Sequence, residues 1–212
     1  MKEILNITEN EKELYTRSSE INVQEDGKLV REIVHEIKDT IRKKGLQHLS
    51  APAIGYNKRI FCIDYKDLEI KTYINPIITG VKGLTLSRET CDCVPGKTFL
   101  VPRSTDISVM YQRPTGQSES KQLLGQAAFV FQHNMNHLDG ILLEDIGLEI
   151  DEDFDNATEE EQGKIIEMYL DSLDIKSKEL EKEVQEDKDL KQVDDAIKFL
   201  EGVAKGEIKQ TV

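Results

Sequence analysis

The feature that most constrains the fold is a pair of histidines, His133 and His137, within a segment of helical periodicity. Apolar residues recur every three or four positions from Leu123 to Leu138, which predicts a helix that ends before Gly140. Residues four apart lie on one face of a helix, one turn from each other. Both imidazoles can therefore bind one metal ion if a third ligand comes from elsewhere. Such a pair also arises by chance on a polar helix face.

Cysteine is the natural candidate for that third ligand. The chain has three cysteines, Cys62, Cys91 and Cys93, and this odd number does not indicate a disulfide framework. Cys62 lies in an apolar run and is typical of a small buried strand residue. Cys91 and Cys93 are separated by one residue, which is too close for an unstrained disulfide. At least one of these two therefore needs a chemical explanation.

The remaining pattern predicts an α+β domain. An apolar stripe from Leu29 to Ile41 predicts a helix that Gly45 ends, and the segment 3–22 is expected to be mixed and extended. Strand-like segments then precede the histidine helix, at 59–64, 72–78, 84–87 and 106–111. A helix, several strands and a second helix indicate antiparallel β-sheets around a central helix.

Charge is concentrated in the last third of the chain. Residues 1–150 hold 21 acidic and 19 basic residues, a net charge of −2, whereas residues 151–212 hold 20 acidic residues and 9 lysines, a net charge of −11. Thr158 and Glu161 form a capping box before one helical stripe, and a second stripe runs through Leu180, Val184, Val193, Ile197 and Leu200. We expect an acidic helical extension that repels nucleic acid and anionic lipid.

Nothing in the sequence indicates a membrane protein. No apolar run approaches the roughly 18 residues that a spanning helix needs. The first twelve residues hold several acids and no apolar stretch, unlike a signal peptide. We therefore expect a cytoplasmic protein.

Three segments resemble, in order, the motifs of the peptide deformylase family. Residues 48–55, HLSAPAIG, are similar to the family's GLAAPQIG; residues 89–96, ETCDCVPG, to its EGCLSVPG; and residues 132–140, QHNMNHLDG, to its QHExDHLDG. The resemblance covers roughly residues 3–147. It implies a deformylase-like domain over residues 1–148 and an acidic helical extension over residues 149–212.

The resemblance also implies a metal centre and a reaction. Its ligands correspond to Cys91, His133 and His137, which would hold one divalent metal, Fe(II) by family resemblance, with Zn(II) or Ni(II) as alternatives. The family removes the formyl group from the initiator methionine of nascent chains, so the implied partner is a formyl-methionyl peptide. Glu89 and Arg103 correspond to an ion pair that braces the site.

Four departures from the family motifs fall on this site. The family's catalytic Glu is Asn134 here, and an amide cannot accept the proton that a carboxylate accepts. The Gln that helps to bind the developing oxyanion is Ala53. The Asp before the second histidine is Asn136, and the first-motif Gly is His48. Metal ligands are therefore retained while the residues that act on the substrate are replaced.

These departures leave three alternatives open. The first is a metal-binding deformylase relative with weak or no turnover, a possible pseudoenzyme. The second is an active deformylase in which His48 replaces the missing base, since imidazole titrates near neutral pH; His48 can also simply fill the space left at Ala53. The third is a module that binds peptides or another partner without hydrolysis. Cys93, in place of the usual Ser, is either inert or a spare thiolate.

Overall fold

The computed structural model describes residues 2–65 and 69–186. Its helices are α1 (Ile7–Leu14), α2 (Gly27–Lys44), α3 (Gln126–Leu138), α4 (Leu143–Ile146), α5 (Glu152–Asn156) and α6 (Glu159–Glu186), with a short 3₁₀ helix, η1 (Pro52–Ile54). Its strands are β1 (His48–Ser50), β2 (Ile60–Ile63), β3 (Lys71–Lys82), β4 (Thr85–Cys91), β5 (Val94–Arg103), β6 (Asp106–Gln112), β7 (Ser118–Leu124) and β8 (Leu148–Ile150).

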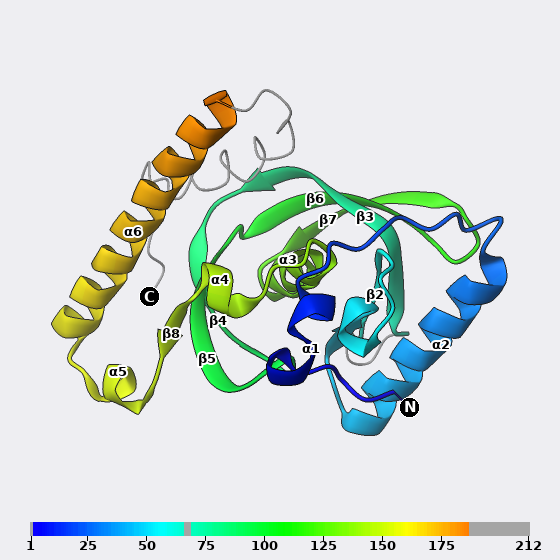
Figure 1. Cartoon of the computed structure of the whole chain (residues 1–212), viewed down its shortest axis with the longest axis horizontal. Coiled ribbons are helices and arrows are strands. Elements are labelled where there is room, and N and C mark those ends of the chain that lie inside the picture. The colour runs from blue at the N-terminus through cyan, green and yellow to red at the C-terminus, as the bar shows by residue number, and fades with distance from the viewer. Residues whose placement is uncertain (1, 66–68, 187–212) are drawn as a thin grey trace.

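Two antiparallel sheets surround the histidine helix. One sheet has the strand order β1-β2-β3-β6-β7 and the other has the order β4-β5-β8. Figure 1 shows α3 end-on at the centre, with strands of both sheets around it. Contacts join α3 to β1, β2 and β7 of the larger sheet and to β5 of the smaller one. The predicted α+β fold with a central helix is confirmed.

Strand β2 shows how the larger sheet is held between two helices. All four of its residues are buried, as its continuous apolar sequence predicts. Ile60 and Cys62 belong to the apolar core that includes α2, whereas Phe61 and Ile63 belong to the core that includes α3. Successive side chains of a strand point to opposite faces, so this one strand contributes to both cores.

Helix α2 follows its sequence pattern closely. Val30, Ile33, Ile37 and Ile41 form its buried stripe. The helix ends at Lys44, and Gly45 takes the left-handed conformation with φ 68°, as predicted for a C-terminal stop. In Figure 1 α2 lies on the outer side of the sheet, beside β2.

The predicted start of the histidine helix is wrong by three residues. Leu123 and Leu124 end strand β7, where Leu123 is buried and Leu124 is exposed, and α3 begins at Gln126. The two leucines fit a helical period by coincidence. The predicted end is confirmed: Gly140 has φ 70°, and a Cβ there would lie 2.4 Å from the carbonyl oxygen of Tyr15. Only glycine fits this close approach.

Other local expectations also need correction. The segment 3–22 is not simply extended, because it contains α1, whose start is capped by Asn6 through a 2.9 Å hydrogen bond from the Thr8 amide. The strand expected at 84–87 continues to Cys91. Strands β5 and β7 were not predicted; β5 contains two prolines and a glycine, and β7 is polar up to the two leucines at its end. Backbone pairing outweighs local propensity in both.

The C-terminal extension begins within the smaller sheet. Ile150 of β8 pairs with Thr98 of β5, and α5 and α6 follow along one side of the molecule (Figure 1). The capping box before α6 is confirmed, since the Thr158 amide donates to Glu161 over 2.9 Å. The expected apolar positions Val193, Ile197 and Leu200 lie outside the described residues. Among the described residues, the structure contains no helix with the length and hydropathy that crossing a bilayer requires.

Candidate metal centre

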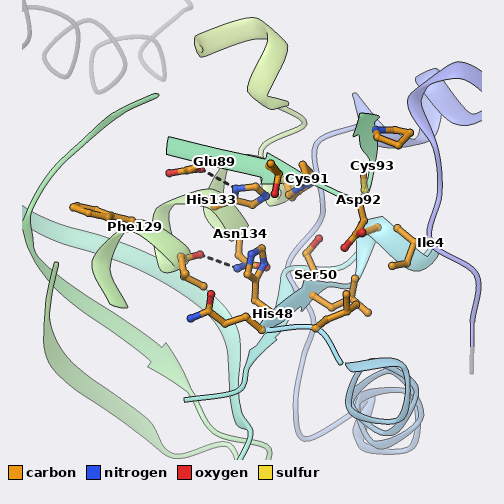
Figure 2. A pocket seen from close by; sticks show the side chains of 18 of the residues that line it. Ile4, His48, Ser50, Glu89, Cys91, Asp92, Cys93, Phe129, His133 and Asn134 are labelled. Carbon is orange, nitrogen blue, oxygen red and sulfur yellow. Dashed lines mark hydrogen bonds and ion pairs between the residues drawn. The ribbon is translucent and has the colours of Figure 1, made fainter. Parts of the chain in front are cut away.

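The fold brings the three expected ligand residues together. Cys91 ends strand β4, and His133 and His137 lie four residues apart on one face of α3. Figure 2 shows the side chains of Cys91 and His133 beside each other. One donor atom from each of the three lies within 4.8 Å of the others, which is a group that can hold a metal ion. The Cys91 sulfur is 3.2 Å from Nε2 of His137. Thiolate and imidazole are ligands that suit Zn(II), Fe(II) and Ni(II).

The second nitrogen of His133 has a partner that fixes the ring. Its Nδ1 is 2.9 Å from the Glu89 carboxylate, so Nε2 is the nitrogen left for a metal. Such a carboxylate behind a histidine is the usual support of a metal ligand, because it sets the tautomer and the ring orientation. Among the described residues, Nδ1 of the buried His137 has no hydrogen-bond partner.

The Glu89 carboxylate that supports His133 also forms a buried ion pair with Arg103. Nε and a terminal nitrogen of Arg103 each donate to Glu89 over 2.8 Å, and Arg103 is 2% exposed. Burial by itself raises the pKa of Glu89, but hydrogen bonds from Arg103 and His133 outweigh it and lower that pKa to about 2. Arg103 also donates to the Asn136 side-chain oxygen. The expected ion pair is thus present and nearly inaccessible to water.

The two neighbouring cysteines have different environments. A hydrogen bond from the Cys93 thiol lowers the pKa of Cys91, and the nearby His137 and His133 lower it further. The same hydrogen bond, together with burial, raises the pKa of Cys93. Cys93 is 1% exposed and packs in the apolar core. The burial of Cys93 and the raised pKa of its thiol favour an inert residue over a spare thiolate.

Asn134 faces this centre with a fixed amide. Its Nδ2 donates to the Val130 carbonyl oxygen over 2.8 Å, one helical turn back, and a carbonyl can only accept. The side-chain oxygen of Asn134 therefore points away from Val130. This oxygen is buried and has no hydrogen-bond partner among the described residues. An amide in this position accepts a hydrogen bond but cannot take up a proton.

A cavity of about 650 Å³ lies beside the candidate ligands. It is lined by the three candidate ligands and by His48, Ala53 and Asn134. Ala53 lies in η1 with 2% exposure. His48 is half-buried on β1, and its ring centroid is 4.8 Å from that of His133. Burial, and then the two other histidines, lower the pKa of His48 to about 3.

Two cavity residues were missed in the sequence. Ser50 is 1% exposed, lines the cavity, and its hydroxyl has no partner among the described residues. It stands where the first motif usually has Ala, so the motif itself held the signal. Arg88 lies at the cavity as well and forms a bidentate pair with Asp155 of α5, at 2.8 and 2.6 Å.

Comparison with known proteins shows the family to which the chain belongs. The sequence profile of the family described as polypeptide deformylase matches residues 1–148. The chain belongs to the polypeptide deformylase family. It is 33% identical over 127 residues to the peptide deformylase of Dictyoglomus thermophilum, covering 60% of this chain and 82% of that one. It is 32% identical over 122 residues to that of Chlorobaculum tepidum, covering 55% of this chain and 65% of the relative.

Solved deformylase structures agree with this assignment. The Thermotoga maritima peptide deformylase superposes with a TM-score of 0.63 at 27% identity, over 69% of this chain and 97% of that one. A probable peptide deformylase from Synechococcus phage S-SSM7 gives a TM-score of 0.62 at 29% identity, over 69% and 99%. The family is metal-dependent, and this member keeps a Cys-His-His cluster that can bind a metal.

Proposed function

We propose that this deformylase relative binds one divalent metal through Cys91, His133 and His137 but hydrolyses formyl-methionyl peptides weakly or not at all. The observation that carries the proposal is Asn134. Its amide is fixed on the Val130 carbonyl in the position where the family has its catalytic Glu. In a deformylase centre the metal supplies Lewis acidity and an activated water.

The residues around the cluster support metal binding. Glu89 holds His133 by its Nδ1, and the Cys91 sulfur already lies 3.2 Å from Nε2 of His137. Both arrangements prepare a ligand before a metal arrives. Fe(II) is the family's usual metal, and the same donor set suits Zn(II) or Ni(II).

The substrate side of the site has lost two catalytic contributions. A positioned general acid–base contributes about 10²–10⁴-fold, and Asn134 cannot supply it. A side-chain donor to the oxyanion contributes about 10²–10³-fold, and the methyl group of Ala53 cannot supply it. The combined loss is at most about 10⁴–10⁷-fold, because groups that act as a unit are not additive.

His48 does not compensate for the missing base. Its pKa is lowered to about 3, so the imidazole is neutral near pH 7 but holds a proton weakly. A general base works best when its pKa lies near the working pH. The alternative of an active enzyme that uses His48 is therefore less well supported than a site with little turnover.

The cavity and the extension complete the proposal. A cavity of about 650 Å³ is within the size range of small-ligand sites, so a formyl-methionyl peptide is the ligand to test first. We propose that residues 149–212 form an acidic extension of one deformylase-like domain at 1–148. Asp155 of this extension pairs with Arg88, which lines the cavity. This part of the extension can therefore contribute to a surface that binds a partner beside the cavity.

Metal analysis and formate release on one sample test this proposal. The full chain is loaded with Ni(II), or with Fe(II) without oxygen, and its metal content is measured before formyl-Met-Ala is added. We expect about one metal per chain and formate release at least about 10²-fold slower than by the Dictyoglomus thermophilum relative under the same conditions. Turnover equal to that relative would refute the proposal, and so would a failure to retain metal.

A further inference from the structure

We propose that His48 is a fourth protein ligand, so that the bound metal has a closed Cys-His₃ shell with no position left for water or substrate. This inference rests on the proposed metal centre and makes it a structural site instead of a catalytic one. Four protein ligands in a tetrahedral arrangement are typical of structural metal sites, whereas catalytic sites keep one position open.

The position of His48 in the sheet directs it to the metal centre. His48 pairs with Ile63 of β2, and directly opposed residues of paired strands lie on the same face. Ile63 belongs to the core that includes α3. His48 therefore faces α3, whereas the next residue, Leu49, is buried in the core that includes α2.

The spacing of the imidazoles matches that of a shared ligand set. The ring centroids of His48 and His133 are 4.8 Å apart, and those of His133 and His137 are 5.1 Å apart. His48 is thus as close to one ligand as the two helical ligands are to each other. The donor atoms grouped within 4.8 Å do not include His48, so ligation requires its side chain to rotate toward them. Ala53, whose side chain is a single methyl group, lines the same cavity as His48.

Asn134 supplies what a fourth histidine ligand needs. A ligating histidine normally donates its second ring N–H to a carboxylate or carbonyl oxygen. Glu89 does this for His133 over 2.9 Å. The Asn134 oxygen is buried, has no hydrogen-bond partner within residues 2–65 and 69–186, and is turned away from Val130. Figure 2 shows Asn134 next to His48, below His133. Asn134 can therefore accept from His48 as Glu89 accepts from His133.

Three substitutions then have one explanation. His48 adds a ligand, Ala53 replaces a longer side chain in the same cavity, and Asn134 orients the added ligand. A closed shell has no use for a general base or an oxyanion donor, so all three departures agree with a metal held without hydrolysis.

Cobalt spectroscopy of the full chain tests the closed shell. Co(II) is added to the wild type, to His48→Ala and to His35→Ala, a control whose histidine is exposed on α2. We expect a four-coordinate Co(II) spectrum in the wild type that acetohydroxamate leaves unchanged. In His48→Ala we expect acetohydroxamate to shift the spectrum and Co(II) affinity to fall by more than about 10-fold. His35→Ala should behave as the wild type.

A second variant and the unmodified protein keep the test decisive if His48→Ala folds poorly. Asn134→Leu should lower Co(II) affinity by about 10- to 100-fold, because it removes the acceptor of a ligand. A wild-type spectrum that acetohydroxamate shifts would overturn the inference, as would a His48→Ala spectrum and affinity equal to the wild type. If the wild type takes up no Co(II), the proposed metal centre fails as well. If the wild type binds Co(II) and one of these contradicting results is obtained, only the role of His48 fails.

Discussion

The two sides of the cavity contrast sharply. On the ligand side, Cys91, His133 and His137 are grouped, and the buried Glu89–Arg103 pair stands behind them. On the substrate side, His48, Ala53 and Asn134 replace the family's Gly, Gln and Glu. On the ligand side, Glu89 links His133 to Arg103 through hydrogen bonds. Buried polar atoms without a partner among the described residues occur on both sides, at Nδ1 of His137 and at the side-chain oxygens of Ser50 and Asn134. Because the family's three ligand residues are kept while residues facing the substrate are replaced, we propose that hydrolysis can be lost while metal binding persists.

Restoring the substrate side should have the largest effect. The triple variant His48→Gly, Ala53→Gln, Asn134→Glu returns an open position, an oxyanion donor and a base. We expect kcat/KM for formyl-Met-Ala to rise by up to about 10⁴–10⁷-fold, with single variants gaining much less. The measurement is formate release by metal-loaded samples of equal metal content. A triple variant no faster than the wild type would show that the defect lies on the ligand side.

Breaking the ion pair on the ligand side should have the next largest effect. Arg103→Met leaves the Glu89 carboxylate buried beside His133 without its cation. We expect the free energy of unfolding in urea to fall by about 3–5 kcal/mol. Arg88→Met is the matched control, because Arg88 pairs with Asp155 at the surface and such pairs contribute little. Equal effects of the two changes would contradict the buried role of Arg103.

Weakening the support of one ligand should have a moderate effect. Glu89→Gln keeps the shape of the side chain but removes the charge that holds His133. We expect affinity for Zn(II), measured by competition with a chelating dye, to fall by about 10- to 100-fold. Glu149→Gln serves as control, since Glu149 pairs with the exposed Lys97 instead. An unchanged affinity in Glu89→Gln would separate this carboxylate from the metal centre.

Removing the Ser50 hydroxyl on the substrate side should have the smallest effect, and it should raise the free energy of unfolding. Ser50→Ala removes a buried hydroxyl that has no hydrogen-bond partner in the described part of the chain, and such a group costs stability. We expect the free energy of unfolding to rise by about 1 kcal/mol. Thermal and urea unfolding of the metal-free proteins measure this difference. A loss of stability would mean that Ser50 has a structural partner and does not belong to the open side of the cavity.

Much of this contrast could be predicted from the sequence, for identifiable reasons. The i, i+4 spacing placed His133 and His137 on one face, and the apolar stripe ended by Gly45 fixed α2. Strand β5 was missed because its prolines and glycine mask a strand whose stability comes from pairing with β4 and β8. The cavity role of Ser50 was also missed, because it depends on segments far apart in the chain that line one cavity. The orientation of Asn134 was missed as well, although the hydrogen bond that fixes it is local, to the Val130 carbonyl one helical turn back.

The most direct test of the whole account is a single-turnover assay on the wild type. Protein carrying one metal per chain is mixed in excess with formyl-Met-Ala, and formate is followed over time, so that product release does not limit the signal. The account predicts that the peptide stays formylated over the interval in which an equal amount of the Dictyoglomus thermophilum relative converts it completely. Complete formate release at the relative's rate would contradict the separation of metal binding from hydrolysis.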